Sequence, residues 1–409
     1  MLLAAVLLAG ALAALGMAVC TGERAAAHDG GMSRAEVMRQ VTALTAIGRE
    51  MFSDPRLSGS GRQSCATCHS PAHAYGPPNA LAVQPGGTDL AASGLRAVPS
   101  LMYKQTTPQF TLHFHESPDE GDESVDAGPT GGLTWDGRFD RGRDQALGPL
   151  LSPLEMANRD RASLAAVIEA NYGDALRGAL GSAMPSGPQG ALAPGLMALE
   201  TFQQDVAEFA PYTSKYDAVL AGTATLSAQE ARGLALFNDP KKGNCAHCHP
   251  STRRDGALPP FTDFGHVALG VPRNRAIPAN RDADFFDLGL CGPERADLTD
   301  QTEYCGMFKA PTLRNVALRR VFFHNGIFHS LKEVMEFYVQ RDTHAERWYP
   351  RDADGRVRKF DDLPSRFHDN INVEPPFDRR PGEAPALTDA EIADVIAFLG
   401  TLTDGYRAP

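Results

Sequence analysis

The feature that most constrains this chain is a short pattern that it carries twice: two cysteines separated by two residues and followed directly by a histidine. The pattern comprises Cys65, Cys68 and His69 in the first copy and Cys245, Cys248 and His249 in the second. Two thiols at this spacing attach a c-type haem through thioether bonds, and the adjacent imidazole ligates its iron. A zinc site or a redox dithiol is the alternative, but neither copy has a second cysteine pair at zinc-site spacing. The pattern therefore predicts two covalently bound haem c groups, with His69 and His249 as iron ligands.

Length, composition and charge indicate a globular protein that does not bind nucleic acid. A length of 409 residues predicts two or three domains, and 43% hydrophobic with 22% charged residues is typical of a globular protein. The formal net charge of −11 argues against binding to nucleic acid, which is itself an anion. We therefore expect no nucleic-acid partner.

The N-terminus predicts export from the cytoplasm. Residues 2–19 form an uninterrupted apolar run, and three alanines at 25–27 resemble a cleavage site, so residues 1–27 are interpreted as a signal peptide. Two alternatives remain open: Cys20 is lipidated, or the apolar run is retained as a membrane anchor. Covalent attachment of haem c also requires an exported location. We therefore expect a bacterial periplasmic protein, either free or lipid-anchored.

Cys291 and Cys305 are left over once the haem motifs and the N-terminal segment have been assigned. In an oxidising compartment they are expected to form a disulfide, which would close a loop of about 15 residues and contribute roughly 3 kcal/mol. Two separate buried thiols are the alternative.

The arrangement of predicted helices indicates a duplicated fold. A helical segment and a glycine-rich turn precede each haem motif, and Ser227 with Glu230 forms a capping box at the start of the second of these helices. Near the C-terminus, Thr388 and Glu391 open an apolar-faced helix that Gly405 is expected to end. We predict a mainly α fold of two class I cytochrome c-like domains, each with one covalent haem, at residues 28–222 and 223–409, with long loops.

Between the haem motifs the sequence predicts helices at residues 161–180 and 196–209, separated by a Gly/Pro/Ser-rich surface loop at 181–195. The domain boundary is expected near residues 221–225, and residues 251–304 are expected to be mostly loop. Residues 110–133 carry His113 and His115 and then several carboxylates. A metal-binding or docking loop is one interpretation, but acidic Gly/Ser/Pro runs are more often solvated insertions, which we favour.

Three further segments carry a family resemblance. They are residues 52–58 before the first haem motif, residues 135–138 after it, and residues 310–317, which continue through residues 323–326. In this order and spacing the chain resembles the bacterial diheme cytochrome c peroxidase and MauG superfamily from about residue 46 to residue 402. The resemblance implies an enzyme that reacts with hydrogen peroxide.

The resemblance also implies roles for four residues. In the family, a tryptophan at the position of Trp135 lies between the two haems and conducts electrons or holes. Gln145, Pro149 and Glu155 fall at positions that line the open face of the first haem. There a carboxyl group can move a proton from the inner to the outer oxygen of peroxide. Without the resemblance, Trp135 is an ordinary core residue and Glu155 an ordinary surface carboxylate.

Departures from the peroxidases indicate a MauG-like subclass. Residues 83–87 contain no histidine where most diheme peroxidases have one, so the first haem is expected to be five-coordinate and open. The sixth ligand of the second haem is a methionine in those peroxidases; here Tyr338 takes that position, as in MauG. An anionic phenolate stabilises oxidised iron, whereas a thioether raises the potential. Met335 is the second candidate and His329 the third; a core aromatic residue is the alternative for Tyr338.

The family's calcium site between the haems is not expected here. Its two side-chain ligands correspond to Ala97 and Arg319, neither of which suits a calcium ion. The Arg319 guanidinium is instead expected to lie where the cation would be.

The function implied is a periplasmic MauG-like enzyme that uses hydrogen peroxide to form a high-valent diheme state and oxidises Trp or Tyr of a partner protein by long-range electron transfer. Residues 287–293, 338–343 and 347–350 look more like family members associated with methanobactin operons, whose partner binds copper. Trp348, if exposed, would then be a candidate hopping site toward the partner; an ordinary buried aromatic residue is the alternative. Two alternatives remain: a cytochrome c peroxidase that takes electrons from a small cytochrome, and a non-catalytic diheme electron carrier in which His73, His113 or His115 closes the first haem.

Overall fold

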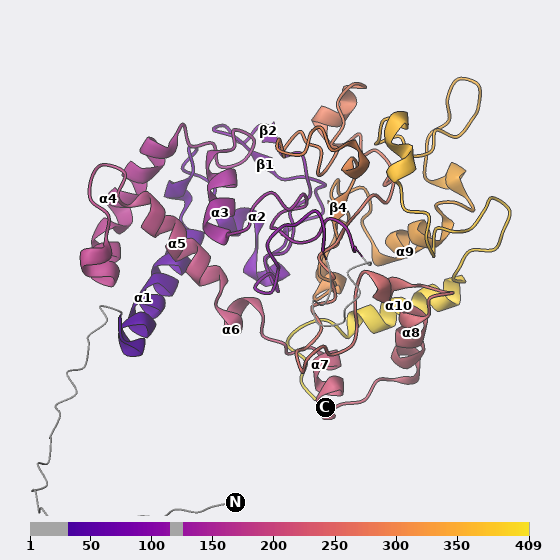
Figure 1. The fold of residues 1–409 in the computed structure, drawn as a ribbon, viewed down its shortest axis with the longest axis horizontal. Helices are drawn as coiled ribbons and strands as arrows, with labels where there is room; N and C mark the ends of the chain where they lie inside the picture. The colour runs from indigo at the N-terminus through magenta and orange to yellow at the C-terminus, as the bar shows by residue number, and fades with distance from the viewer. Residues whose placement is uncertain (1–31, 115–125, 409) are drawn as a thin grey trace, which may run out of the picture.

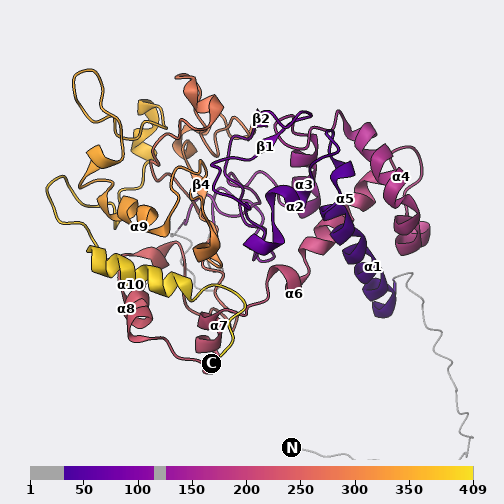
Figure 2. The same cartoon turned by 180° about the vertical axis from the view of Figure 1, so that it is seen from behind.

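The computed structural model describes residues 32–114 and 126–408, so the predicted signal peptide and His115 lie outside the described residues. The chain forms two helix-bearing halves that meet along a loop-rich middle, where the short strands lie (Figure 1). The same division is seen from behind in Figure 2. None of the described helices is both long and apolar enough to span a bilayer.

The elements follow one another with long connections. The helices of the first half are α1 (Arg34–Phe52), α2 (Cys65–Cys68), α3 (Gly142–Leu151), α4 (Arg161–Leu180), α5 (Leu192–Gln203) and α6 (Val206–Phe209). Those of the second half are α7 (Lys215–Leu220), α8 (Ala228–Asn238), α9 (Leu331–Gln340) and α10 (Asp389–Gly400). The 3₁₀ helices are Pro55–Leu57, Pro71–His73, Gly181–Ala183, Cys245–His247, Pro278–Arg281, Thr302–Tyr304, Val316–Leu318, Ala345–Arg347 and Ser365–Asn370.

Two antiparallel strand pairs complete the described structure. Strand β1 (Pro85–Gly86) pairs with β2 (Ala92–Ser93), with Pro85 opposite Ser93. Strand β3 (His266–Val267) pairs with β4 (Phe308–Lys309), with His266 opposite Lys309. The predicted helix-rich fold with long loops is therefore confirmed, including the loop-rich stretch at 251–304.

The same helix crossing occurs in both halves. Helix α1 crosses α5 at Gly48, where an added Cβ would lie 2.0 Å from the Ala198 carbonyl oxygen. Helix α8 crosses α10 at Gly233, where an added Cβ would lie 2.0 Å from the Asp394 carbonyl oxygen. Only glycine allows two helix backbones to approach this closely, so each half is built around one such crossing.

A separate hydrophobic core fills each half. The first includes Met51, Phe52, Leu164, Ile168 and Phe202, and the second includes Tyr216, Phe237, Phe337, Val395 and Phe398. Tyr212 still packs against the first core, whereas Tyr216 of α7 packs in the second. The change of core thus precedes the predicted boundary at 222/223, because the Tyr216 amide donates to the Thr401 carbonyl at 3.0 Å and anchors α7 beside α10.

Several sequence predictions are confirmed in detail. Helix α4 has the predicted bounds, and capping boxes at Ser227 and Thr388 start α8 and α10. Cys291 and Cys305 form the predicted disulfide. His113 lies in the exposed part of the acidic segment, where its Nδ1 is 2.5 Å from Asp126 Oδ2.

Two predicted helices differ from those in the structure. The segment at 196–209 is not one helix: α5 begins at Leu192, inside the predicted loop, and a new helix starts after Asp205, whose carboxylate caps the Ala207 amide. Helix α10 ends at Gly400 rather than Gly405. The chain leaves the helix there because Asp404 is held elsewhere, by hydrogen bonds from Tyr103 and Asn315.

The glycine crossing gives a test of the fold. Gly48→Ala should lower the free energy of unfolding by about 1–3 kcal/mol, because the new methyl group meets a backbone carbonyl that cannot rotate away. Gly178→Ala is the matched control, since this α4 glycine has open space around it. There alanine should raise the free energy of unfolding by about 0.5–1 kcal/mol. Urea unfolding followed by circular dichroism measures both. Equal effects of the two substitutions would contradict the crossing.

Candidate functional site

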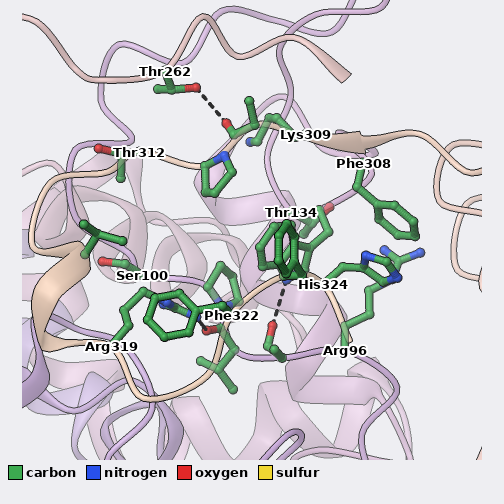
Figure 3. Close-up of a pocket in the computed structure, with 18 of the residues that line it drawn as sticks. Arg96, Ser100, Thr134, Thr262, Phe308, Lys309, Thr312, Arg319, Phe322 and His324 are labelled. Atoms are coloured by element: carbon green, nitrogen blue, oxygen red, sulfur yellow. Dashed lines mark hydrogen bonds between the residues drawn. The ribbon is translucent and has the colours of Figure 1, made fainter. Parts of the chain in front are cut away.

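One cavity of about 450 Å³ is lined by residues of both halves, and its wall contains both Cys-x-x-Cys-His motifs. Part of this wall is seen in Figure 3, with Thr262 and Lys309 in the upper part of the view and Arg319 and Phe322 below. The cavity is therefore the place where any group held by the two motifs would lie.

The two motif histidines are held in the same way. Nδ1 of His69 lies 3.0 Å from the Tyr75 carbonyl oxygen, and Nδ1 of His249 lies 2.8 Å from the Phe261 carbonyl oxygen. A carbonyl only accepts, so Nδ1 carries the proton and Nε2 keeps its lone pair. Burial lowers the pKa of both imidazoles to about 4, which leaves them neutral near pH 7. Both histidines thus have the form that binds a metal ion.

The cysteines lie on short helical turns next to these histidines. The His69 amide donates to the Cys65 carbonyl at 2.8 Å, and the His249 amide donates to the Cys245 carbonyl at 2.9 Å. In both copies one turn of helix therefore brings two thiols and one imidazole to the cavity wall. This donor set, repeated on the wall of one large cavity, fits two haem groups that are held through thioethers and ligated from one face.

All four predicted catalytic residues line the same cavity. Gln145 and Pro149 lie one turn apart on α3, and Glu155 follows in the turn after this helix. Burial raises the pKa of the Glu155 carboxyl, the charge of Glu294 raises it further, and Ser152 and Arg138 oppose this rise. Glu155 can therefore hold a proton at the cavity wall at a higher pH than an ordinary carboxyl group.

Trp135 is fixed by its indole and by the residue that follows it. Its Nε1 donates to the Ala97 carbonyl oxygen at 2.7 Å, and its ring is nearly buried. Asp136 is fully buried and accepts from Arg96 Nη1 at 2.6 Å and from Arg138 Nη1 at 2.7 Å. Arg96 also binds Asp287, with Nε and Nη2 at 2.6 and 2.7 Å from its two oxygens. This buried charge cluster fixes Trp135 against a loop of the second half.

Charge pairing decides the ionisation of Asp136. Burial alone would raise the pKa of its carboxyl, but the charges of Arg96 and Arg138 outweigh burial and lower it to about 2. Beside the cluster, the rings of Phe308 and His324 are stacked at 3.5 Å, with Arg96 next to them (Figure 3). Arg96 and Arg138 of the cluster line the cavity together with these two rings.

The three candidates for the second haem's sixth ligand are placed differently. Tyr338 and Met335 of α9 both line the cavity, whereas His329 is exposed and is not part of the wall. The Tyr338 ring lies between Phe323 and Phe377, with ring centroids at 5.8 and 5.4 Å. Burial raises the pKa of Tyr338, and the nearby Cys248 and Cys245 sulfurs contribute, which places its hydroxyl near the second motif.

Arg319 also lies on the cavity wall, close to backbone oxygens. Its Nη2 donates to the Val98 carbonyl at 3.0 Å and its Nε to the Val321 carbonyl at 3.3 Å. Burial lowers its pKa to about 10, so the guanidinium stays charged. The positive charge of Arg319 thus binds carbonyl oxygens next to Ala97.

Sequence reasoning missed two buried lysines and a carboxylate on this wall. Lys104 donates to Gln203, and Lys309 donates to the Gly132 carbonyl; burial lowers their pKa to about 8 and about 7. Ammonium groups facing a haem cavity can pair with propionates. The carboxylate is Glu294, which reaches the wall from the disulfide-closed loop. No sequence period marks these residues, since two loops and strand β4 bring them to the cavity separately.

The remaining candidates lie outside the centre of the site. His73 lines the cavity, but its Nδ1 lies 3.0 Å from Ser70 Oγ in the turn that follows His69. Trp348 is only half-buried, packs edge-to-face on Phe328 and Phe337, and has no hydrogen-bond partner for its Nε1. Phe337 precedes Tyr338 on α9 and lies in contact with both the Tyr338 and the Trp348 rings.

Comparison with known proteins defines the class. Residues 42–225 match the family described as Di-haem cytochrome c peroxidase. The chain is 32% identical over 381 residues to the methylamine utilization protein MauG of Paracoccus denitrificans, covering 90% of both chains. The solved diheme peroxidase BthA of Burkholderia thailandensis is 40% identical, with a TM-score of 0.77 over 88% of this chain and 86% of that chain. A MauG-like protein associated with microbial copper homeostasis is 26% identical, with a TM-score of 0.61 over 92% and 91%.

The fold and the site therefore define a haem-dependent oxidoreductase of the diheme peroxidase type. The chain belongs to the diheme cytochrome c peroxidase/MauG family, as the resemblance implied. Such a family member carries two haem groups.

The buried charge cluster gives a testable prediction on stability. Asp136→Asn should lower the free energy of unfolding at pH 7 by about 3–5 kcal/mol, because it leaves buried arginine charges without their partner. The folded pKa of about 2 lies below the ordinary value of 3.8, so the contribution is present above pH 3.8 and is lost as the pH falls toward 2. Urea unfolding as a function of pH measures this difference.

Asp174→Asn is the control, because Asp174 pairs with Arg177 on the fully exposed surface of α4. A loss of stability for Asp136→Asn no greater than that of the control would show that the cluster is not a structural requirement.

Proposed function

We propose that this chain is a periplasmic MauG-like enzyme that uses hydrogen peroxide to oxidise Trp or Tyr side chains of a partner protein. The observation that carries the proposal is the position of Tyr338 on the cavity wall beside the second cysteine motif. Each half is proposed to be a class I cytochrome c-like domain, supported by the repeated helix crossing at Gly48 and Gly233. When bound, the two haems supply the redox chemistry and store the oxidising equivalents taken from peroxide.

The residues of the first half would prepare peroxide for cleavage. His69 is proposed to ligate the first iron, with its Nδ1 proton held by the Tyr75 carbonyl. From the cavity wall Gln145 would hold peroxide by hydrogen bonds, and Pro149 would keep water away. Glu155 would take the proton from the inner oxygen and return it to the outer one, which leaves as water.

Trp135 and Tyr338 would determine where the oxidising equivalents are stored. Trp135 is proposed to carry charge between the two haems, and its hydrogen bond to the Ala97 carbonyl keeps the ring in place. His249 and Tyr338 are the residues that would hold the second iron. A phenolate there favours the oxidised metal, so the second haem would store oxidising power rather than receive electrons at high potential.

The partner is proposed to be a protein of the same compartment. The likeness to a MauG-like protein associated with microbial copper homeostasis supports a copper-binding partner. Trp348 remains a candidate for charge transfer to such a partner, because its ring contacts Phe337, which in turn contacts Tyr338.

A second candidate function rests on Met335. This residue lines the same cavity as Tyr338, one turn earlier on α9. If its thioether ligated the second iron, the potential would rise and the protein would act as a cytochrome c peroxidase with electrons from a small cytochrome.

Electron paramagnetic resonance of the oxidised protein tests the proposal. We expect one high-spin and one low-spin ferric signal, both lost on adding stoichiometric peroxide without reductant. Tyr338→Phe should alter the low-spin signal and abolish or change this response, because the anionic ligand is gone. Met335→Leu is the matched control on the same helix and should behave as wild type.

The outcomes separate the two functions. If Met335→Leu rather than Tyr338→Phe alters the low-spin signal, the cytochrome c peroxidase is favoured. Two low-spin signals that do not respond to peroxide would overturn the proposal and favour an electron carrier.

Arg319 predicts independence from calcium. Prolonged dialysis against a calcium chelator should leave the haem absorption spectrum and the peroxide response unchanged, because a guanidinium already binds the Val98 and Val321 carbonyls. Loss of the high-spin signal after dialysis, restored by adding calcium, would contradict this assignment.

A further inference from the structure

Tyr75 connects the first haem motif with a carboxylate near the protein surface. Its backbone carbonyl accepts from His69 Nδ1 at 3.0 Å, and its hydroxyl donates to Glu208 Oε1 of α6. The path from the imidazole to the phenol ring therefore runs through one hydrogen bond and the few covalent bonds of a single residue. Electrons pass more readily along bonded paths than across gaps, because the orbitals of bonded atoms overlap.

The Tyr75 ring is tightly packed and shielded from water. Only 4% of the residue is exposed, and the ring centroids of Phe209 and Phe52 lie at 4.2 and 5.7 Å from its own. These two neighbours are hydrocarbon rings that cannot take up a proton. Among the described residues, Glu208 is the hydrogen-bond acceptor of this phenol, so it is the group placed to receive the phenol proton.

The Glu208 carboxylate is kept ionised by Arg49 of α1. Arg49 Nη1 donates to Glu208 Oε2 at 2.6 Å, so each carboxylate oxygen has its own donor. Burial acts to raise the pKa of Glu208, but the hydrogen bonds from Tyr75 and Arg49 outweigh burial and lower the pKa. The Glu208 side chain is also 29% exposed, so it can pass a proton on to solvent.

Removing one electron from a phenol makes its hydroxyl a strong acid, so the proton leaves in the same step. We propose that Tyr75 is a redox-active residue that gives one electron to the haem of the first half while its proton passes to Glu208. The balanced step is Tyr–OH + Glu–COO⁻ → Tyr–O• + Glu–COOH + e⁻, and the electron reduces the peroxide-oxidised haem. The inference rests on the proposed function, which supplies that oxidant.

Such a step would remove oxidising equivalents when no partner protein is bound. A strong oxidant that stays in the cavity attacks the side chains around it. Glu208 and the half-exposed Arg49 bring the end of the path to the surface, where a small reductant can restore the phenol. Tyr75 would thus protect the site between encounters with the partner.

Tyr103 is the competing candidate, because it lines the cavity and donates to Asp404 at 2.7 Å. The Arg314 guanidinium, however, lies 4.7 Å from the centroid of the Tyr103 ring. A cation over an aromatic face opposes the loss of an electron from that ring. The geometry therefore favours Tyr75 as the electron donor.

Electron paramagnetic resonance tests the inference on haem-bearing protein frozen at intervals after adding stoichiometric peroxide without substrate. Wild type should develop a tyrosyl radical signal as the ferric signals return, and ring-deuterated tyrosine should narrow it. Tyr75→Phe should lose this signal and recover its ferric signals more slowly, although its backbone carbonyl still accepts from His69. Tyr172→Phe is the matched control and should keep the signal, because Tyr172 donates to Asp54 at 2.7 Å in the same hydrophobic core.

Glu208→Gln tests the proton step. The amide oxygen can still accept a hydrogen bond from the phenol, but a neutral amide does not take up its proton. Formation of the radical should therefore slow by roughly 100-fold or more. An unchanged rate would overturn the assignment of Glu208 as the proton acceptor.

The outcomes keep this inference apart from the proposed function. A radical signal that survives in Tyr75→Phe and is lost in Tyr103→Phe would overturn it, as would the absence of any radical in wild type that reacts with peroxide. Ferric signals that do not respond to peroxide would instead overturn the proposed function. Flash oxidation of the ferric protein by a ruthenium sensitiser would then still decide whether Tyr75, rather than Tyr172, gives up the electron.

Discussion

The buried carboxylate of Asp136 is the interaction on which most of the site depends. It binds Arg96 and Arg138, and Arg96 in turn binds Asp287 of the second half. Burying several charges together is favourable only when each finds a partner, so the cluster forms only when both halves are in place. Because Trp135 precedes Asp136 directly, the same cluster places the indole on the cavity wall.

The cavity is a joint product of two similar halves. Each half contributes one glycine-mediated helix crossing and one turn that presents two thiols and a neutral imidazole. The halves differ in what faces those turns: α3 presents Gln145 and Pro149, whereas α9 presents Tyr338. Under the proposed function, the first face would bind peroxide and the phenol beside the second motif would hold an oxidised metal. The two haems could therefore have different roles, because different side chains face the two motifs.

Much of this could be predicted from the sequence because the signals are local. The haem motifs span five residues each, and the starts of α8 and α10 depend on side chains three residues apart. The failures have an equally physical cause. The apolar pattern at 196–209 hides the break at Asp205, because a capping carboxylate interrupts the helix without changing its hydrophobic face. The change from one hydrophobic core to the other before residue 222 leaves no local signal, because Tyr216 finds its partners in the distant second half.

The sequence by itself predicted two haem groups and the family, because the haem motifs and the family's matching segments are short local patterns. Only the tertiary structure decided that Glu294 lines the same cavity as Glu155, that Arg96 joins Asp136 to Asp287, and that Arg319 binds backbone carbonyls beside Ala97. These contacts join residues distant in the chain. Such contacts form only when the chain folds and long loops close, so no local pattern in the sequence predicts them.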